Sequence, residues 1–332
     1  MNNSEIHIPV LKREVLDALN IRSGGVYIDA TLGRAGHAQA IAEHIGEQGR
    51  LIGIDRDPRA IELGESVFSG DARVDVLHGE FNCMAALMAE HTELSHVDGI
   101  LMDLGVSSPQ LDQAERGFSF MRDGELDMRM NPTKGLSAAQ WIESVDERDF
   151  MMVLFELGEE KYARRIARAV VEARDETKIQ STLQLASIVE QAIPKKDKNK
   201  HPATRTFQAV RLHVNQELFQ VSSALPQAVE LLSEGGRLAV ISFHSLEDRI
   251  VKRFIRELST PNLPPKNIPV SDEAYLTPLK MIGKAIKPSR AEIAENPRSR
   301  SSVLRVAERT AESYSAPNIE QKASKNGGAH AR

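Results

Sequence analysis

The first third of the chain alternates two kinds of hydrophobic pattern. Short, continuous apolar runs rich in β-branched residues predict buried strands at residues 26–30, 51–54, 74–77 and 97–102. Before and between them, apolar positions recur every three to four residues and predict helices at residues 10–19, 37–45, 58–65 and 84–90. Strands that alternate with helices are typical of right-handed βαβ units, so we predict an α/β fold with a parallel sheet.

The pattern changes after the fourth predicted strand. Between residues 137 and 193 only helical periodicity is present, and a lysine-rich segment follows it. Two further helices are predicted at 205–219 and 222–232, and strand signals return at 237–243 and 302–306.

These changes predict the domain organisation. We expect one α/β domain formed by residues 1–135 and 206–310, interrupted after its fourth strand by an inserted helical domain at 136–205. Residues 311–332 are rich in Ser, Ala, Asn, Gly and Lys without an apolar pattern, and they predict a disordered tail.

Composition narrows the class of protein. The 332 residues are 41% hydrophobic and 27% charged, which is typical of a folded globular chain. A single cysteine, Cys83, excludes an intrachain disulfide framework and a cysteine metal cluster, and the scattered histidines predict no metal site. Without a membrane-length apolar run or a signal-peptide pattern, we expect a cytoplasmic location and no membrane partner.

Charge is distributed unevenly along the chain. The net charge is −5, yet residues 159–211 hold 12 Lys/Arg against 7 Asp/Glu, a local charge of +5. Such a concentration in an otherwise acidic protein can steer an anion to one region.

The segment between the first strand and the next helix has the composition of a ligand-binding turn. Asp29 ends the strand, and Gly33 and Gly36 allow backbone N–H groups at a helix N-terminus to approach a ligand. Asp55, at the end of the second strand, can accept both hydroxyls of a ribose. Together they predict an adenosine-containing ligand; the alternative is a plain tight turn, with the acid capping a helix.

The glycine count separates two adenosine ligands. A dinucleotide loop usually has three glycines in G-x-G-x-x-G, and the third is missing here. An acid at the first strand tip would also repel a pyrophosphate, whereas it suits the ammonium group of S-adenosylmethionine. The loop therefore favours a methyl donor over NAD. Phe81, after the third strand, could line the adenine pocket or serve as a core aromatic residue.

The segment after the fourth strand is a candidate amine site, running from Asp103 to Gln110 with the sequence DLGVSSPQ. Proline has no N–H and serine hydroxyls are short, so the segment offers oxygen acceptors to an amino group. It resembles a relaxed form of the Ser/Asn/Asp-Pro-Pro-aromatic motif of nucleobase aminomethyltransferases, without the second proline and the aromatic residue. A helix N-cap is the alternative role for either serine.

The chain resembles the family of ribosomal RNA small-subunit methyltransferase H, also called MraW. The matching blocks cover nearly the whole chain except the tail: 7–11, 29–37, 53–58, 103–111, 115–122, 126–130, 201–211, 241–249 and 296–302. The resemblance implies a Rossmann-like class I sheet that uses S-adenosylmethionine. It also implies methylation of N4 of one cytidine in the decoding centre of 16S rRNA, with the small ribosomal subunit as partner.

The resemblance also implies roles for individual residues. The donor contacts at matching positions are Ala35, Gly36, His37, Asp55, Phe81, Asp103 and Gln110. Where the family has a glycine pair before His37, this chain has Ala35-Gly36, and we expect a negative φ at the alanine.

The candidate catalytic residues are Ser107, Ser108 and Pro109. A serine hydroxyl and a loop carbonyl would accept the hydrogens of the amine and free its lone pair, with the proline stiffening the loop. Asp103 is the alternative proton acceptor.

Several other side chains have two possible roles. His244, at the tip of the fifth strand, could touch the base or be structural, and Ser245 and Asp248 are expected to start a helix. Trp141 is a stacking platform or a core anchor. The basic residues of the predicted insertion are RNA contacts or a solvated helix face: Lys161, Arg164, Arg165, Arg168, Lys195, Lys196, Lys198, Lys200, Arg205 and Arg211.

The sequence leaves other functions open. The same fold would suit a nucleotide-dependent oxidoreductase, against which the missing third glycine argues, or a non-catalytic RNA-binding factor that retains a donor pocket. Whether free rRNA or the assembled subunit is the substrate, and whether the protein is a monomer or a dimer, also stay open.

Overall fold

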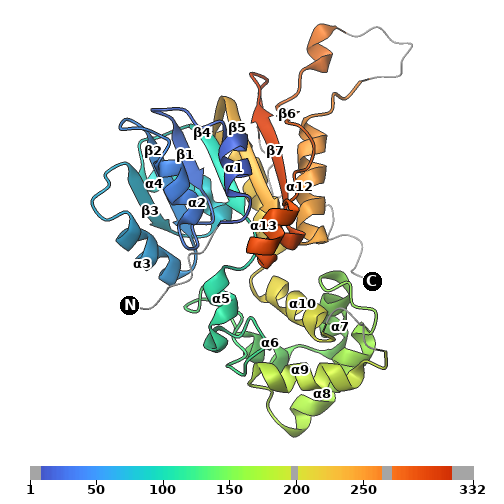
Figure 1. Ribbon diagram of the computed structural model, residues 1–332. Helices are drawn as coiled ribbons and strands as arrows, with labels where there is room; N and C mark the ends of the chain where they lie inside the picture. The colour runs from blue at the N-terminus through green and yellow to red at the C-terminus, as the bar shows by residue number, and fades with distance from the viewer. Residues whose placement is uncertain (1–8, 196–200, 264–270, 316–332) are drawn as a thin grey trace. The chain divides into compact units, whose positions relative to one another are not determined.

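The computed structural model describes residues 9–195, 201–263 and 271–315 (Figure 1). Its centre is a seven-stranded sheet with the strand order β3-β2-β1-β4-β5-β7-β6. The strands are β1 Val26–Asp29, β2 Arg50–Asp55, β3 Val74–His78, β4 Val97–Asp103, β5 Leu232–Ser242, β6 Leu279–Met281 and β7 Val303–Arg309. Strands β1 to β5 pair in parallel, and β7 and β6 are antiparallel. The predicted Rossmann-like α/β sheet is therefore confirmed.

Helices cover both faces of this sheet. Neighbouring residues of β4 pack to opposite sides: Ile100 and Met102 join one apolar core and Leu101 joins another. The first core includes α4 Met84–His91, α11 Glu217–Leu231 and α12 Ser245–Leu258, and the second includes α1 Lys12–Leu19 and α2 Gly36–Ala42. Because both faces are covered, the central strands carry continuous apolar runs, which is why the sequence predicts them well. The remaining helices of this part are α3 Pro58–Val67 and α13 Arg290–Glu295.

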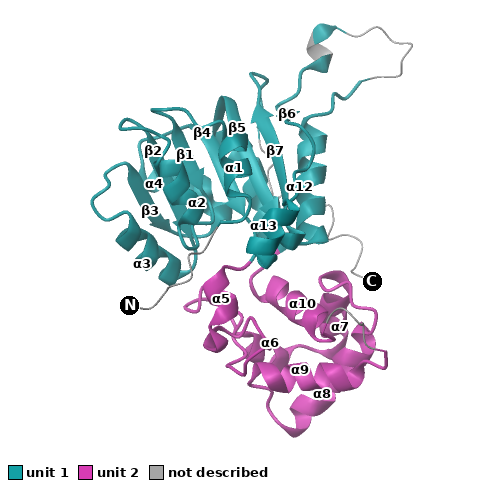
Figure 2. Ribbon diagram, in the orientation of Figure 1, with its two compact units in different colours: residues 1–105, 218–332 teal, residues 106–217 magenta. Residues whose placement is uncertain are grey.

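The chain divides into two compact units (Figure 2). Unit 1 comprises residues 1–105 and 218–332, and unit 2 comprises residues 106–217. Unit 2 contains α5 Ser108–Asp112, α6 Ala138–Ser144, α7 Glu147–Glu156, α8 Ala163–Glu176, α9 Thr182–Ala192 and α10 Thr204–Val214. Among the described residues, no helix is long and apolar enough to cross a membrane.

Unit 2 is larger than the predicted insertion at 136–205. Leu126 and Met128, outside that range, are buried in the same core as the helices. The side chain of Asn215 donates to the Met128 carbonyl at 2.7 Å and accepts from the Met130 N–H at 2.8 Å. These long-range bonds attach irregular chain on both sides of the helices to their core, and no periodic pattern reveals them. Most of the predicted tail, residues 316–332, lies outside the described residues.

Two further differences have local causes. The helix predicted at 205–219 is divided, because α10 ends at Val214 and Gln216 adopts φ 50° before α11 begins. Strand β6 was not predicted, since its three residues are too few to show a period of two.

The turn between β1 and α2 holds an alanine in a left-handed conformation. Ala35 has φ 60° and is fully buried, so the expected negative φ is wrong. Close packing is instead required at Gly36, where an added Cβ would lie 2.6 Å from Cγ of Pro9. An L-residue in the left-handed region costs about 1–2 kcal/mol, and the surrounding core holds Ala35 there against that cost.

Replacing Ala35 with glycine should stabilise the folded protein. Ala35→Gly should raise the free energy of unfolding by about 0.5 kcal/mol, because relief of the left-handed conformation exceeds the loss of one buried methyl group. Ala38→Gly, in the helix that follows this turn and at an equally buried position, should lower it by about 1–2 kcal/mol. Urea unfolding measures both, and equal destabilisation by the two variants would contradict this account.

Candidate functional site

Three carboxylates end neighbouring strands at the carboxyl edge of the sheet. Asp29 ends β1, Asp55 ends β2 and Asp103 ends β4. The register places Asp29 opposite Gly53 on one side and Leu101 on the other. In open α/β sheets, ligands bind at this edge, where the strand order reverses. Strand β1 lies at that point, since β2 and β4 flank it.

Asp55 shapes the glycine turn. Its Oδ2 accepts from the Gly33 N–H at 2.8 Å, and its Oδ1 accepts from the Asp57 N–H at 2.8 Å. The next helix is capped by Asp57, which accepts from the Arg59 N–H at 3.1 Å, so Asp55 does not cap that helix. A carboxylate has about four acceptor positions, which leaves capacity for ligand hydroxyls. Burial raises its pKa, and these N–H groups oppose the rise.

Asp29 is almost completely buried at the base of the same turn. Its Oδ1 accepts from the Thr31 N–H at 3.1 Å. Burial raises its pKa to about 7, opposed by hydrogen bonds from Thr31 and Ala38 and reinforced by the nearby charge of Asp55. The folded protein therefore holds this carboxyl partly protonated at neutral pH.

Asp103 has an acceptor atom without a hydrogen bond. Its N–H donates to the Thr31 hydroxyl at 2.7 Å, and its Oδ2 lies 3.7 Å from Nε2 of His37. Its Oδ1 is buried and has no hydrogen-bond partner among the described residues. Burial, followed by the charges of Asp29 and Glu247, raises its pKa well above the usual range.

These three carboxylates determine which kind of ligand this edge of the sheet can bind. Each carries a charge that burial penalises. The charge of Asp55 raises the pKa of Asp29, and that of Asp29 raises the pKa of Asp103. A ligand with positive charge would lower these pKa values, and an N–H or O–H donor would satisfy Oδ1 of Asp103. The edge is therefore suited to a cationic ligand that also carries hydroxyl groups.

The structure brings together most of the predicted donor residues in unit 1. His37, in the first turn of α2, is mostly buried beside Asp103, and Ala35 and Gly36 form the start of that helix. The segment leading to Phe81 lies beside Asp55, because the Gly79 N–H donates to the Asp55 carbonyl at 2.9 Å. Phe81 itself is partly buried against the sheet core, which agrees with either of its predicted roles.

The other predicted residues lie at the start of α5 in unit 2. Ser107 is the N-cap, Ser108 is the first helical residue and is buried, and Pro109 follows it. Gln110 Oε1 accepts from the Ser107 N–H at 3.0 Å as part of a capping box. The segment is thus a capped helix N-terminus that contains backbone N–H donors as well as hydroxyl acceptors, whereas the sequence suggests acceptors alone.

The carboxyl edge of the sheet that holds Asp29, Asp55 and Asp103 is called the acidic edge below. Sequence analysis missed Glu247, a further carboxylate whose charge acts on Asp103 there. The N-cap of α12 is His244, and Ser245 is the first helical residue. Glu247 Oε2 accepts from the N–H groups of Phe243 and His244 at 3.0 and 3.3 Å, and its Oε1 lies 3.1 Å from Nε2 of His244. A carboxylate three residues after the N-cap residue, as in a capping box, is the signal that could have found it.

The basic residues of unit 2 divide into free and committed groups. Lys161, Arg164 and Arg165 are exposed on or beside α8. Arg211 is bound by the Glu217 carboxylate at 2.8 and 3.0 Å, so it is not available as the phosphate contact we expected. Lys196, Lys198 and Lys200 lie outside the described residues, and Lys195 borders that gap. Arg205, in α10, donates to the Glu159 carbonyl at 3.3 Å.

Trp141 is one member of an aromatic cluster in unit 2. Its ring centroid lies 5.3 Å from that of Phe150 and 4.2 Å from that of His213. This packing agrees with the core-anchor role rather than with a stacking platform. Among the described residues, no group of three or more His, Cys, Asp or Glu side chains could hold a metal ion.

The chain is similar to known methyltransferases. A SAM-dependent O-methyltransferase from Thermotoga maritima has a TM-score of 0.41 and 9% identity, with 94% of this chain and 71% of that chain covered. An rRNA methylase from Streptococcus thermophilus has a TM-score of 0.39 and 9% identity, covering 90% of this chain and 93% of that one. The model of the MraW methylase family matches residues 4–310. The chain belongs to the MraW methylase family.

Membership in this family identifies a methyltransferase whose methyl donor is S-adenosylmethionine. The acidic edge fits that donor. The sulfonium and ammonium groups carry positive charge, and the ribose offers two hydroxyls to carboxylate acceptors. The unpartnered Oδ1 of Asp103 is an acceptor for the donor's N–H or O–H groups.

The pKa of Asp29 predicts a pH dependence of stability without the donor. The folded chain keeps the proton up to about pH 7, whereas the unfolded chain loses it near pH 4. The free energy of unfolding of the wild type should therefore fall as pH rises through that window. Asp29→Asn has no charge to bury, so its stability relative to the wild type should increase by roughly 3 kcal/mol between pH 4.5 and 8.

Denaturant unfolding at both pH values measures this difference. Asp71→Asn is the control, because its carboxyl has a pKa lowered to about 2 by Arg73 and does not titrate in this window. A pH-independent effect of Asp29→Asn would show that the buried carboxyl is not protonated.

Proposed function

We propose that the protein transfers the methyl group of S-adenosylmethionine to the N4 amine of one cytidine in the decoding centre of 16S rRNA. The observation that carries the donor half is the edge of three strand-end carboxylates with raised pKa values, of which Asp29 is buried and Asp55 and Asp103 are partly buried. Family membership supports methyl transfer. The choice of a cytidine N4 in 16S rRNA is supported by the sequence blocks that resemble the family.

The acceptor half of the proposal involves the start of α5. This segment begins four residues after Asp103 in the sequence. Ser107 and Ser108 supply hydroxyl oxygens, and Pro109 replaces one N–H donor of the first helical turn. An amine needs acceptors for its hydrogens, so a helix start that contains proline and serines suits it better than an ordinary one.

The N4 amine of cytosine is a poor nucleophile, because its lone pair is delocalised into the ring. Hydrogen bonds from the amine to a serine hydroxyl and a backbone carbonyl would favour a pyramidal nitrogen and free that lone pair. The bound donor supplies a methyl group on a sulfonium that needs no further activation. Positioning of the amine by this segment therefore contributes much of the rate.

The proton released by the amine also needs an acceptor. Asp103 is the candidate in unit 1, since its raised pKa shows that the folded environment favours the protonated carboxyl. A serine hydroxyl hydrogen-bonded to the amine would orient that proton without taking it permanently.

The RNA half of the proposal is supported by charge. Lys161, Arg164 and Arg165 lie on one exposed stretch of unit 2, in the segment with a local charge of +5. Exposed cations of this kind contact phosphates, and a base must leave its stack to react. If these residues only form a solvated helix face, replacing them would leave the affinity for RNA unchanged. A binding measurement therefore separates the two alternatives.

Mapping the modified base tests the function. Small ribosomal subunits and protein-free 16S rRNA, both lacking the methyl group, are incubated with the protein and tritiated S-adenosylmethionine. We expect label on N4 of a single cytidine in the decoding centre. Label on carbon 5, on a ribose or on another base would contradict the proposal, as would donor binding without any transfer to RNA.

Variants of the two serines test the acceptor site. Ser107→Ala with Ser108→Ala should lower the single-turnover methylation rate about 10- to 100-fold, because a hydrogen bond to the reacting amine is lost. Ser137→Ala is the matched control, since Ser137 forms the equivalent capping box at α6 in the same unit. It should lose similar stability and keep the wild-type rate. Equal rates for all three proteins would remove the serines from the mechanism.

A further inference from the structure

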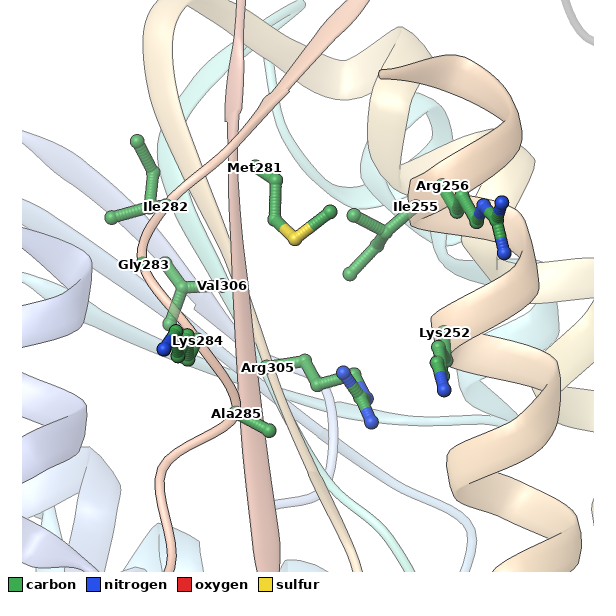
Figure 3. Close-up of a pocket in the computed structure, with 10 residues that line it drawn as sticks. All are labelled: Lys252, Ile255, Arg256, Met281, Ile282, Gly283, Lys284, Ala285, Arg305 and Val306. Atoms are coloured by element: carbon green, nitrogen blue, oxygen red, sulfur yellow. The ribbon is translucent and has the colours of Figure 1, made fainter. Parts of the chain in front are cut away.

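A pocket in unit 1 lies outside the donor edge. Helix α12 forms one wall, and β7 with the segment after β6 forms the other (Figure 3). Figure 3 shows the side chains of Ile255 and Met281 pointing toward each other across the gap, and that of Arg305 reaching toward α12 near Lys252. None of the roles discussed above uses this pocket.

The floor of the pocket is apolar. Ile255 is buried in the core on this face of the sheet, and Met281 beside it is 48% exposed. Methionine is flexible and polarisable, and it makes favourable contacts with aromatic rings. A flat ring is therefore a suitable occupant.

The rim of the pocket is cationic. Lys252, Arg256 and Lys284 line it and are exposed, and no acidic partner pairs with them among the described residues. Arg305 differs, because Asp248 accepts from its Nε at 2.6 Å and from its Nη2 at 3.0 Å. Three uncommitted cations around an apolar floor complement a ligand that combines negative charge with a flat ring.

We propose that this pocket binds one nucleotide of a single-stranded RNA segment that neighbours the methylated base. The base rests on Ile255 and Met281, and the phosphates lie against Lys252, Arg256 and Lys284. Proteins read single-stranded RNA by this combination of ring contacts and backbone cations. The inference rests on the proposed RNA substrate and adds a contact for it.

The elements that build the pocket also reach the acidic edge of the same unit. Helix α12 begins with the cap that contains Glu247, and β7 pairs with β5 so that Val303 lies opposite Ser242. Arg305 is two residues farther along β7, a rise of about 7 Å. The Asp248–Arg305 pair joins the start of α12 to that strand. A nucleotide held in this pocket and a base held at the acidic edge of the sheet would belong to the same RNA strand.

Variants of the rim and the floor distinguish how much the cations and the contact with the base each contribute to RNA affinity. Lys252→Gln, Arg256→Gln and Lys284→Gln together should raise the Kd for a single-stranded RNA oligonucleotide around the target cytidine at least 10-fold at 0.1 M salt. The slope of log Kd against log salt should fall by about 2, since each lost phosphate contact on a single strand removes about 0.7. Met281→Ala should raise Kd several-fold without changing the slope.

Controls come from the same unit. Lys280→Gln matches Lys284→Gln in charge, but Lys280 does not line the pocket and alternates with Met281 along β6. The variant with Lys12→Gln, Arg13→Gln and Lys280→Gln matches the triple rim variant. We expect both controls to bind RNA within about twofold of the wild type. S-adenosylmethionine affinity and thermal unfolding should be unchanged in every variant, since the altered side chains are exposed.

The outcomes distinguish this inference from the proposed function. If the wild type methylates and binds RNA and the rim variant binds equally well, the pocket is not an RNA site and the proposed function stands. If the rim variant loses affinity for small subunits but not for protein-free 16S rRNA, an acidic protein segment occupies the pocket and the inference is overturned. If the wild type binds no RNA, both are overturned. A loss of RNA affinity confined to the rim and floor variants supports the inference.

Discussion

The constraint on which this structure depends is the burial of negative charge where three neighbouring strands end. Asp29, Asp55 and Asp103 lie on β1, β2 and β4. The turn holds the first two through backbone N–H groups, and Asp103 lies beside His37. Burial of unpaired carboxylates is unfavourable, so the folded chain raises their pKa values. A cation bound at this edge would therefore stabilise the folded protein, and the methyl donor of this family is a cation.

The turn after β1 shows how the fold supports this edge. Asp55 fixes Gly33 through its N–H, and the hydroxyl of Thr31 accepts from the N–H of Asp103. These bonds join three strands through one loop, so the carboxylates are placed by the backbone. The left-handed Ala35 and the close approach of Gly36 to Pro9 are local costs of the same turn. The turn therefore keeps unfavourable backbone and packing geometry at a position where a ligand would bind.

The sequence predicted the elements that repeat a simple pattern and missed those fixed by contacts distant in sequence. Buried parallel strands show continuous apolar runs, so β1 to β4 were placed to within about two residues. The strand-end acids followed directly from that placement. Unit 2 was underestimated because a side-chain amide, that of Asn215, joins irregular chain to its core. Likewise, the capture of Arg211 by Glu217 depends on where α10 ends, which no charge count can show.

The most direct test of the central claim is proton release when S-adenosylmethionine binds. If the carboxyls of Asp29 and Asp103 hold protons in the free protein and lose them beside the donor's positive charge, binding at pH 7 must release protons into the buffer. Isothermal titration calorimetry in buffers with different ionisation enthalpies counts them. We expect release of about half a proton or more per donor bound at pH 7, since the pKa of Asp29 is about 7. Binding enthalpies that do not depend on the buffer would contradict the account, because the acids would then be charged before the donor arrives.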